Sequence, residues 1–108
     1  MAAHRRTVNV AVQVLPLAED PYPIVDRAIA VIQASGLRYE VGPMETTLEG
    51  DDLDALLAVA REAHLACFEA GASKVVTIIK IADAVEGTSI DEKVGKYRKG
   101  QHEKTGTA

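Results

Sequence analysis

The sequence contains few of the residues from which several kinds of functional site are built. It has one cysteine, Cys67, among 108 residues, which excludes an intramolecular disulfide and a multi-cysteine metal site. The formal net charge is −4 and basic residues cluster only near the C-terminus, so the electrostatic footprint of a nucleic-acid-binding protein is missing. No apolar run approaches the roughly 18 residues of a membrane span. We therefore expect a soluble, cytoplasmic protein with no nucleic-acid or membrane partner.

What the chain does contain is typical of one globular domain. Hydrophobic residues make up 47% of the sequence against 26% for charged residues, which is an ordinary balance for a protein with a core. The length is near the commonest size for one domain. We expect a single domain over residues 1–98 and a flexible C-terminal tail over residues 99–108.

Strand and helix periods alternate along the chain. Residues 8–14 place four valines on one side and Asn9, Ala11 and Gln13 on the other, which is a strand pattern. The expected elements are strands at 7–15, 37–41, 44–50 and 74–82, helices at 24–35 and 51–70, and a short helix over 89–97 that begins with the capping box "SIDE".

The second helix has recognisable ends and an apolar stripe. Asp51 or Asp52 suits its N-cap, and Gly71 suits the left-handed position after its last turn. The stripe expected to face the core consists of Leu53, Leu57, Ala60, His64 and Cys67, widened by Leu56 and Phe68. His64 is therefore interpreted as a core or interface residue, with ligand binding as its alternative, and Cys67 as a small buried hydrophobic residue.

The order βαββαβ predicts a ferredoxin-like α+β fold, with a four-stranded antiparallel sheet, two helices on one face, and a short C-terminal helix. The strand at 74–82 is apolar on both sides, with Val75, Ile79 and Ile81 opposite Val76 and Ile78. A sheet covered on one face alone should alternate more cleanly. We expect the other face to pack against a second subunit, in a homo-oligomer.

Four segments carry a resemblance to a known family: "VQVLPL", "SGLRYEVGPMETTLEG", "AHLACFEAGASKVVTIIKI" and "EKVGKY". In their order and spacing, over residues 8–97, the chain resembles the small thiamine-binding protein family, formerly a domain of unknown function. The resemblance implies ferredoxin-like subunits that form dimers or tetramers. It also implies binding of thiamine, or of its hydroxymethylpyrimidine half, without catalysis.

The hairpin motif of that family is Pro-Met-Gly-Thr-x-x-Glu-Gly. Residues 43–50 fit it except at Glu45, which replaces the glycine. Asp83-Ala84 stands where the family often has Asp-Arg, so we expect a salt bridge to the tail to be lost with that arginine.

A carboxylate suits the ring nitrogen and amine of an aminopyrimidine, and an acidic site favours the thiazolium charge. Glu49 is the candidate for this carboxylate, with Thr46 or Thr47 as a hydroxyl contact and with Asn9 and Gln13 reaching the site from the first strand. A structural role is the alternative for each: the threonines as ordinary strand residues, and Glu49 as a partner of the second helix dipole.

Enzymatic motifs are missing from the sequence. There is no glycine-rich phosphate loop, nucleophile elbow or paired His or Cys motif, so we expect a protein without catalytic residues, metal or cofactor. An RNA-binding protein of this topology needs stacking aromatics on its first and third strands, and these strands have none. Two alternatives stay open: a regulatory module that binds an amino acid at a subunit interface, and an assembly protein without a ligand.

Overall fold

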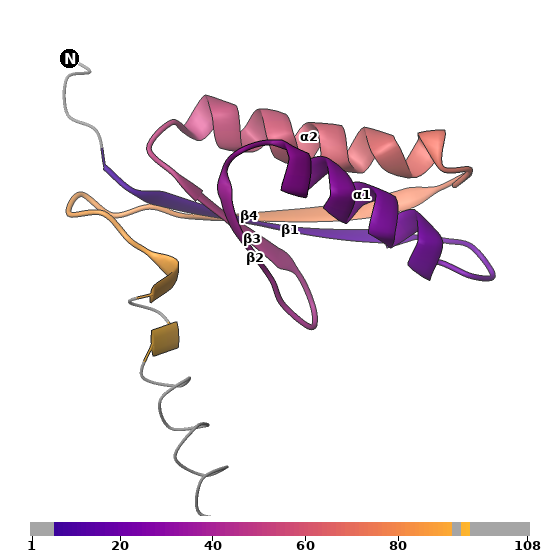
Figure 1. Ribbon diagram of the computed structural model, residues 1–108, viewed down its shortest axis with the longest axis horizontal. Coiled ribbons are helices and arrows are strands. Elements are labelled where there is room, and N and C mark those ends of the chain that lie inside the picture. The colour runs from indigo at the N-terminus through magenta and orange to yellow at the C-terminus, as the bar shows by residue number, and fades with distance from the viewer. Residues whose placement is uncertain (1–5, 92–93, 96–108) are drawn as a thin grey trace, which may run out of the picture.

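The computed structural model describes residues 6–91 and 94–95. Its elements are β1 (Val8–Pro16), α1 (Tyr22–Ala34), β2 (Arg38–Val41), β3 (Thr46–Gly50), α2 (Leu53–Glu69) and β4 (Val75–Ala82). The strands form one antiparallel sheet in the order β2-β3-β1-β4, and both helices lie on one face of it (Figure 1). The ferredoxin-like fold expected from the sequence is confirmed.

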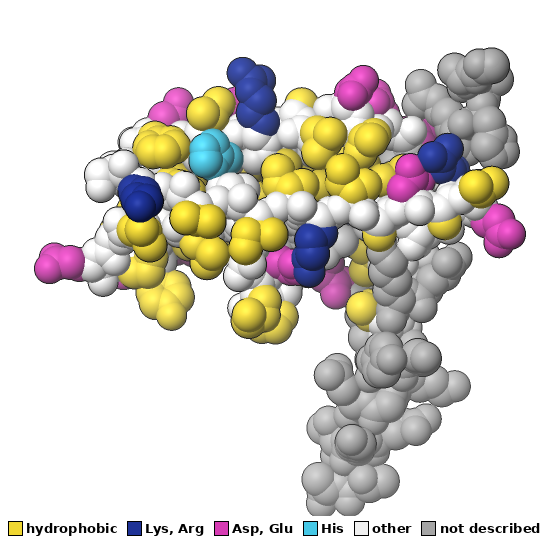
Figure 2. All heavy atoms as spheres, turned by 180° about the vertical axis from the view of Figure 1, so that it is seen from behind, with side chains coloured by type: hydrophobic (Ala, Val, Ile, Leu, Met, Phe, Trp, Pro, Cys, Tyr) yellow, Lys and Arg dark blue, Asp and Glu magenta, His cyan; other side chains and the backbone are white. Residues whose placement is uncertain are grey.

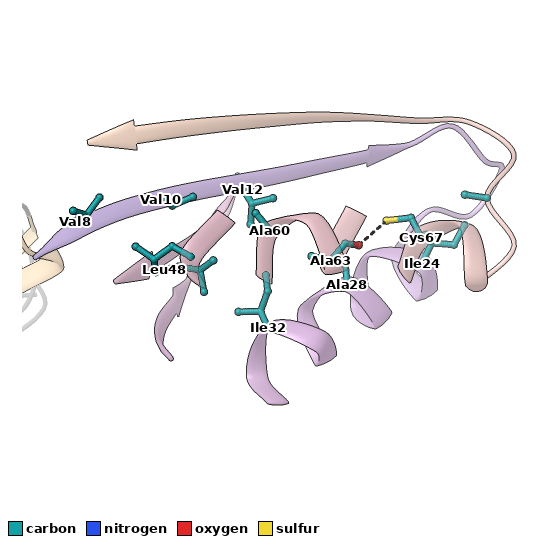
Figure 3. Packing of buried hydrophobic residues seen from close by; sticks show 12 residues of the cluster. Val8, Val10, Val12, Ile24, Ala28, Ile32, Leu48, Ala60, Ala63 and Cys67 are labelled. Carbon is teal, nitrogen blue, oxygen red and sulfur yellow. Dashed lines mark hydrogen bonds between the residues drawn. The ribbon is translucent and has the colours of Figure 1, made fainter. Parts of the chain in front are cut away.

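The two faces of β1 differ as its alternation predicts. Val8, Val10 and Val12 are buried against the helices, and Figure 3 shows them pointing into the core beside Leu48 of β3. Side chains that are directly opposite on neighbouring strands share a face. The register therefore places the alternate residues of the sheet on its other side, which we call the open face.

Helix α1 owes its bounds to proline and glycine. Pro23 lies in its first turn, where a missing N–H costs nothing. At its end, the Ser35 hydroxyl donates to the Ile32 carbonyl at 2.6 Å and accepts from the Leu37 N–H at 3.1 Å. Gly36 follows with φ +82°, which an L side chain rarely adopts. This turn directs the chain into β2.

Helix α2 begins as expected and faces the core differently. The Asp52 carboxylate accepts from the N–H groups of Asp54 and Ala55 at 3.0 and 3.3 Å, so the predicted N-cap is confirmed. The buried residues of this helix, in full, are Leu56, Ala60, Ala63, Ala66 and Cys67.

The expected stripe of α2 was therefore wrong in part. Phe68 is 44% exposed and His64 is half-buried at the edge of the core, whereas Ala63 and Ala66 are buried. The physical reason is that α2 packs against both α1 and the sheet, and small side chains let these backbones approach closely. Gly50 serves the same packing, because a Cβ there would lie 3.3 Å from the Leu56 side chain.

After β4 the chain returns to the open face of the sheet. The Thr88 N–H donates to the Thr7 carbonyl at 2.9 Å, and a helical turn begins at Ile90. Figure 1 shows this segment on the side of the sheet away from α1 and α2. Residues 90–91 and 94–95 are helical, as the capping box predicts. Glu92, the end of the expected helix at 96–97 and the expected tail lie outside the described residues.

Candidate functional site

The open face has a polar half and an apolar half. The polar half lies where β2 and β3 pair with the start of β1, and it consists of Asn9, Arg38, Glu40, Thr47 and Glu49. The apolar half lies where the end of β1 pairs with β4, with Leu15 opposite Val76 and with Ile78 opposite Gln13. The segment that follows β4 covers the polar half.

A cavity of about 340 Å³ lies between this segment and the polar half. Its wall consists of Asn9, Glu40, Gly42, Pro43, Met44, Glu45, Thr47, Ile90 and Val94. A neighbouring hollow of about 460 Å³ shares part of this wall and extends along β1 and β4 to Ala11 and Lys80. Ligand sites for small molecules commonly occupy 300–1,000 Å³, so the cavity has room for one aromatic ring system and its substituents.

The β2–β3 turn forms one end of the cavity. The Gly42 N–H donates to the Glu45 carbonyl at 2.9 Å and closes the turn. A Cβ on Gly42 would meet that carbonyl at 3.0 Å, so glycine suits this position. Glu45 departs from the family motif without strain, because all described residues with positive φ are glycines. Its carboxylate forms a salt bridge with Lys80 at 3.0 Å.

Charge on the described cavity wall is of one sign. Its ionisable residues are Glu40 and Glu45, and Lys80, which pairs with Glu45, lines the neighbouring hollow and not this cavity. The remaining wall is apolar apart from Asn9 and Thr47. Such a cavity favours a ligand that has an apolar ring face, an edge rich in hydrogen-bond donors, or a positive charge.

Glu49 lies beneath the covering segment and has several partners there. Its Oε1 accepts from the Ile90 N–H at 2.6 Å and from Asn9 Nδ2 at 3.3 Å, and its Oε2 accepts from Arg38 Nη1 at 3.0 Å. Its side chain is 12% exposed and does not line the cavity. Asp52, not Glu49, caps α2. Glu49 therefore supports the wall of the cavity from below.

Arg38 is a site residue that sequence reasoning missed. Its guanidinium donates to both carboxylate oxygens of Asp91, at 2.9 and 3.2 Å, and to Glu49. These hydrogen bonds and the positive charge hold the pKa of Asp91 below its ordinary value. A signal for Arg38 was present: with a four-residue turn at 42–45, hairpin register places it opposite Glu49.

The structure brings together three of the five residues proposed from the sequence. Asn9, Thr47 and Glu49 meet on the polar half. Thr46 pairs with Val12 and Val41, faces the helices and is 5% exposed. Gln13 pairs with Ile78 outside this cavity. Thr46 and Gln13 both line a smaller hollow of about 110 Å³ on the side of α1.

Three further features have structural roles. Arg6 donates to both oxygens of Asp83 at 2.7 Å, and these hydrogen bonds lower the pKa of Asp83. Asp83 therefore has an arginine partner, although Ala84 replaces the arginine of the family's Asp-Arg pair. His64 Nδ1 lies 2.6 Å from Thr77 Oγ1 and its ring meets Phe68 edge-on. The Cys67 thiol is buried, its pKa is raised by that burial, and it donates to the Ala63 carbonyl.

A salt bridge to the segment after β4 is present, although its arginine does not come from position 84. Residue 84 supplies no arginine, yet Arg38 makes a salt bridge to Asp91 in the returning segment.

Within the described residues there is no cluster of His, Cys, Asp and Glu suited to a metal ion. In the same part of the chain, no helix is both long enough and apolar enough to cross a membrane.

A ferredoxin-like domain with an acidic cavity on its open face is thus the class of protein that the geometry defines. The chain belongs to the thiamine-binding protein family, whose model matches residues 10–98, which confirms the resemblance seen in the sequence. A UPF0045 protein of Clostridium perfringens is 47% identical over 94 residues, which cover 85% of this chain and 98% of that protein.

Two solved structures are similar throughout the domain. A domain of unknown function, DUF77, from Bacillus cereus has a TM-score of 0.80 and 51% identity, and the match covers 90% of this chain and 95% of that one. A candidate thiamine biosynthesis/salvage protein of Thermotoga maritima has a TM-score of 0.75 and 35% identity, with 84% and 98% covered. Together with the family, these neighbours support a role in small-molecule binding.

Proposed function

We propose that this protein binds thiamine, or its hydroxymethylpyrimidine moiety, in the cavity on the polar half of the open face, and that it does so without catalysis. The observation that carries the proposal is the cavity wall, which combines two carboxylates with apolar surface and two polar side chains. The family's description and the Thermotoga maritima neighbour support the choice of ligand.

Each part of the wall matches a part of this ligand. The amine and ring nitrogen of an aminopyrimidine suit the polar groups of Asn9 and Thr47, which lie on adjacent strands. Glu40 attracts the thiazolium charge, and Glu45 does so less strongly because Lys80 pairs with it. Ile90 and Val94 offer an apolar surface to the ring face. Glu49, the carboxylate first proposed from the sequence, acts on the ligand through Asn9 and the wall that it supports.

Self-association is the second part of the proposal. Val76 and Ile78 are 45% and 44% exposed on the open face, and Ile79 and Ile81 are similarly exposed on the other face of the same edge strand. Figure 2 shows hydrophobic side chains gathered across the side of the molecule opposite to Figure 1. Monomers rarely leave so much apolar surface in water, so we infer a homodimer or homotetramer that covers β4.

Neighbouring threonines provide the test of the site. Thr47→Val keeps the shape of the side chain and removes a hydroxyl from the cavity, whereas Thr46→Val makes the same change on the helix face. Loss of one neutral hydrogen bond should weaken binding by roughly two- to tenfold. Titration calorimetry with thiamine, and with the pyrimidine alone, should show this loss for Thr47→Val and an unchanged affinity for Thr46→Val.

Thermal shift assays distinguish the rival functions. A ligand at 100 times its dissociation constant stabilises the folded state by about 2.7 kcal/mol, so binding is readily seen. A shift with free amino acids and none with thiamine or the pyrimidine would favour a regulatory module. No shift with either set would favour an assembly protein without a ligand.

A further inference from the structure

The segment that closes the cavity is held by polar contacts on either side of the buried residue Ile90. Ile90 is 3% exposed and contributes its side chain to the cavity wall. Just before it, Thr88 is tied to Thr7 by a backbone hydrogen bond of 2.9 Å. Just after it, Asp91 is held by the Arg38 guanidinium. The position of Ile90 is thus set by groups on the sheet.

Three charged side chains form this attachment, two from the β2–β3 hairpin and one from the covering segment. Arg38 of β2 lies between the carboxylates of Glu49 and Asp91, with N–O distances of 3.0 Å to the first and 2.9 Å to the second. Glu49 also accepts the Ile90 N–H at 2.6 Å. Without the guanidinium, two carboxylates would face each other at the point where the segment meets the sheet.

We propose that Arg38 and Glu49 are positioning residues for ligand binding: they dock residues 88–91 on the open face and so couple the closing of the cavity to its occupation. Arg38, Glu49 and Asp91 do not line the cavity, whereas Ile90, which they place, does. The inference rests on the proposed function, since it concerns the same cavity.

Coupling of this kind is reciprocal. If a docked segment raises affinity for a ligand, the bound ligand stabilises the docked segment by the same factor. The Ile90 amide reports docking directly, because its hydrogen bond to Glu49 joins the segment to the sheet. Its hydrogen-exchange rate should fall when the cavity is filled.

The test compares two arginines that make the same kind of contact. Arg38→Gln breaks the pair with Asp91, and Arg6→Gln breaks the equally bidentate pair with Asp83, which is outside the cavity wall. Exchange of the Ile90 amide and of the β1 amides would be followed by NMR, with and without thiamine, on the full chain. Asp91→Asn tests the same contact from an exposed position.

We expect Arg38→Gln and Asp91→Asn to speed exchange of the Ile90 amide roughly two- to fivefold, because loss of an exposed ion pair has an effect of this size. Both variants should weaken thiamine binding by up to the same factor. The β1 amides and Arg6→Gln should show neither change, and Arg38→Lys should restore part of both. Equal Ile90 exchange in Arg38→Gln and the parent protein, or faster exchange with unchanged affinity, overturns the proposal. A parent protein that binds neither thiamine nor the pyrimidine overturns the proposed function instead, and Ile90 exchange without ligand still tests the docking.

Discussion

The two halves of the open face are built on the same strand and differ in what covers them. At the start of β1, Asn9 is 2% exposed because residues 88–91 return over it. At the other end, Leu15 is 39% exposed beside Val76 and Ile78. In the part of the chain that the structure describes, the polar half is covered by residues 88–91 and the apolar half stays exposed.

The difference is what suits one sheet face to the two roles proposed for it. A polar surface under a covering segment leaves hydrogen-bonding groups with partners and a cavity between them, which suits a ligand. A bare apolar surface instead gains free energy when another molecule removes it from water. The alternation of each strand is the same in both halves, so the distinction depends on which residue types occupy the open positions.

The largest expected effect comes from placing a charge in the apolar half. Ile78→Asp, or Val76→Asp, should lower the association constant by at least about a hundredfold, because an unpaired carboxylate would enter a desolvated interface. Analytical ultracentrifugation at micromolar concentration measures this, with Gln33→Asp on the exposed side of α1 as the control. A parent protein that is a stable monomer, or an oligomer that both variants leave intact, contradicts the assignment of this half to self-association.

A smaller effect is expected from the polar half. Glu49→Gln keeps the shape of the side chain but replaces one acceptor oxygen by a donor, in a group that bonds to Ile90, Asn9 and Arg38. Each hydrogen bond to a charged group contributes about 1.5–3 kcal/mol. Because Glu49 bonds to the protein and not to the ligand, only the part of this loss that loosens the covering segment reaches the affinity, and binding of the pyrimidine should weaken by up to about tenfold in calorimetry.

The control for Glu49→Gln is a substitution of Asp52, a carboxylate that accepts hydrogen bonds from backbone N–H groups. Asp52→Ala removes the α2 cap and should lower the free energy of unfolding by about 0.5–2 kcal/mol without a change in affinity. If Glu49→Gln behaves like Asp52→Ala, with lower stability and unaltered binding, Glu49 belongs to the scaffold alone.

The smallest effect concerns pH and the docking of the covering segment. The pKa of Asp91 is held below its ordinary value of 3.8 by hydrogen bonds from Arg38. A lowered pKa in the folded state means that this contribution is complete above pH 3.8 and is lost as the pH falls through the lower value. Protection of the Ile90 amide, corrected for intrinsic exchange, should therefore decrease as the pH is lowered from 5 to 2. The decrease should be smaller in Asp91→Asn, and an identical profile in both proteins would show that Asp91 does not hold the segment.

Thr46 and Thr47 show how far strand patterns reach. Their segment was expected as a strand, and the structure has β3 there. The pairing of Thr46 with Val12 and of Thr47 with Ala11 decides which threonine points toward the helices. A shift of the register by one residue would exchange the two. The sequence therefore indicated both threonines, and the register with β1 separates them.

Local patterns were sufficient for the elements and their order. Alternation in β1, the Gly42-Pro43 turn, the Asp52 cap and the Gly36 that follows α1 act within a few residues, so propensity and period reveal them. The position of Arg38 opposite Glu49 follows from the hairpin register and could also have been inferred from the sequence. These features led to the ferredoxin-like fold and to three residues of the candidate site.

Long-range packing accounts for the rest. The side of α2 that faces the core depends on where α1 lies. Ala63 and Ala66 are therefore buried there, whereas the sequence pattern predicted His64 and Phe68. The segment that lines the cavity with Ile90 meets the sheet through the Arg38–Asp91 contact, which spans 53 positions of sequence. No periodicity predicts where a segment beyond the last strand will dock. Such contacts become favourable only when the sheet has placed Arg38 and Glu49 side by side, because exposed charges gain little from each other until the fold holds them in position.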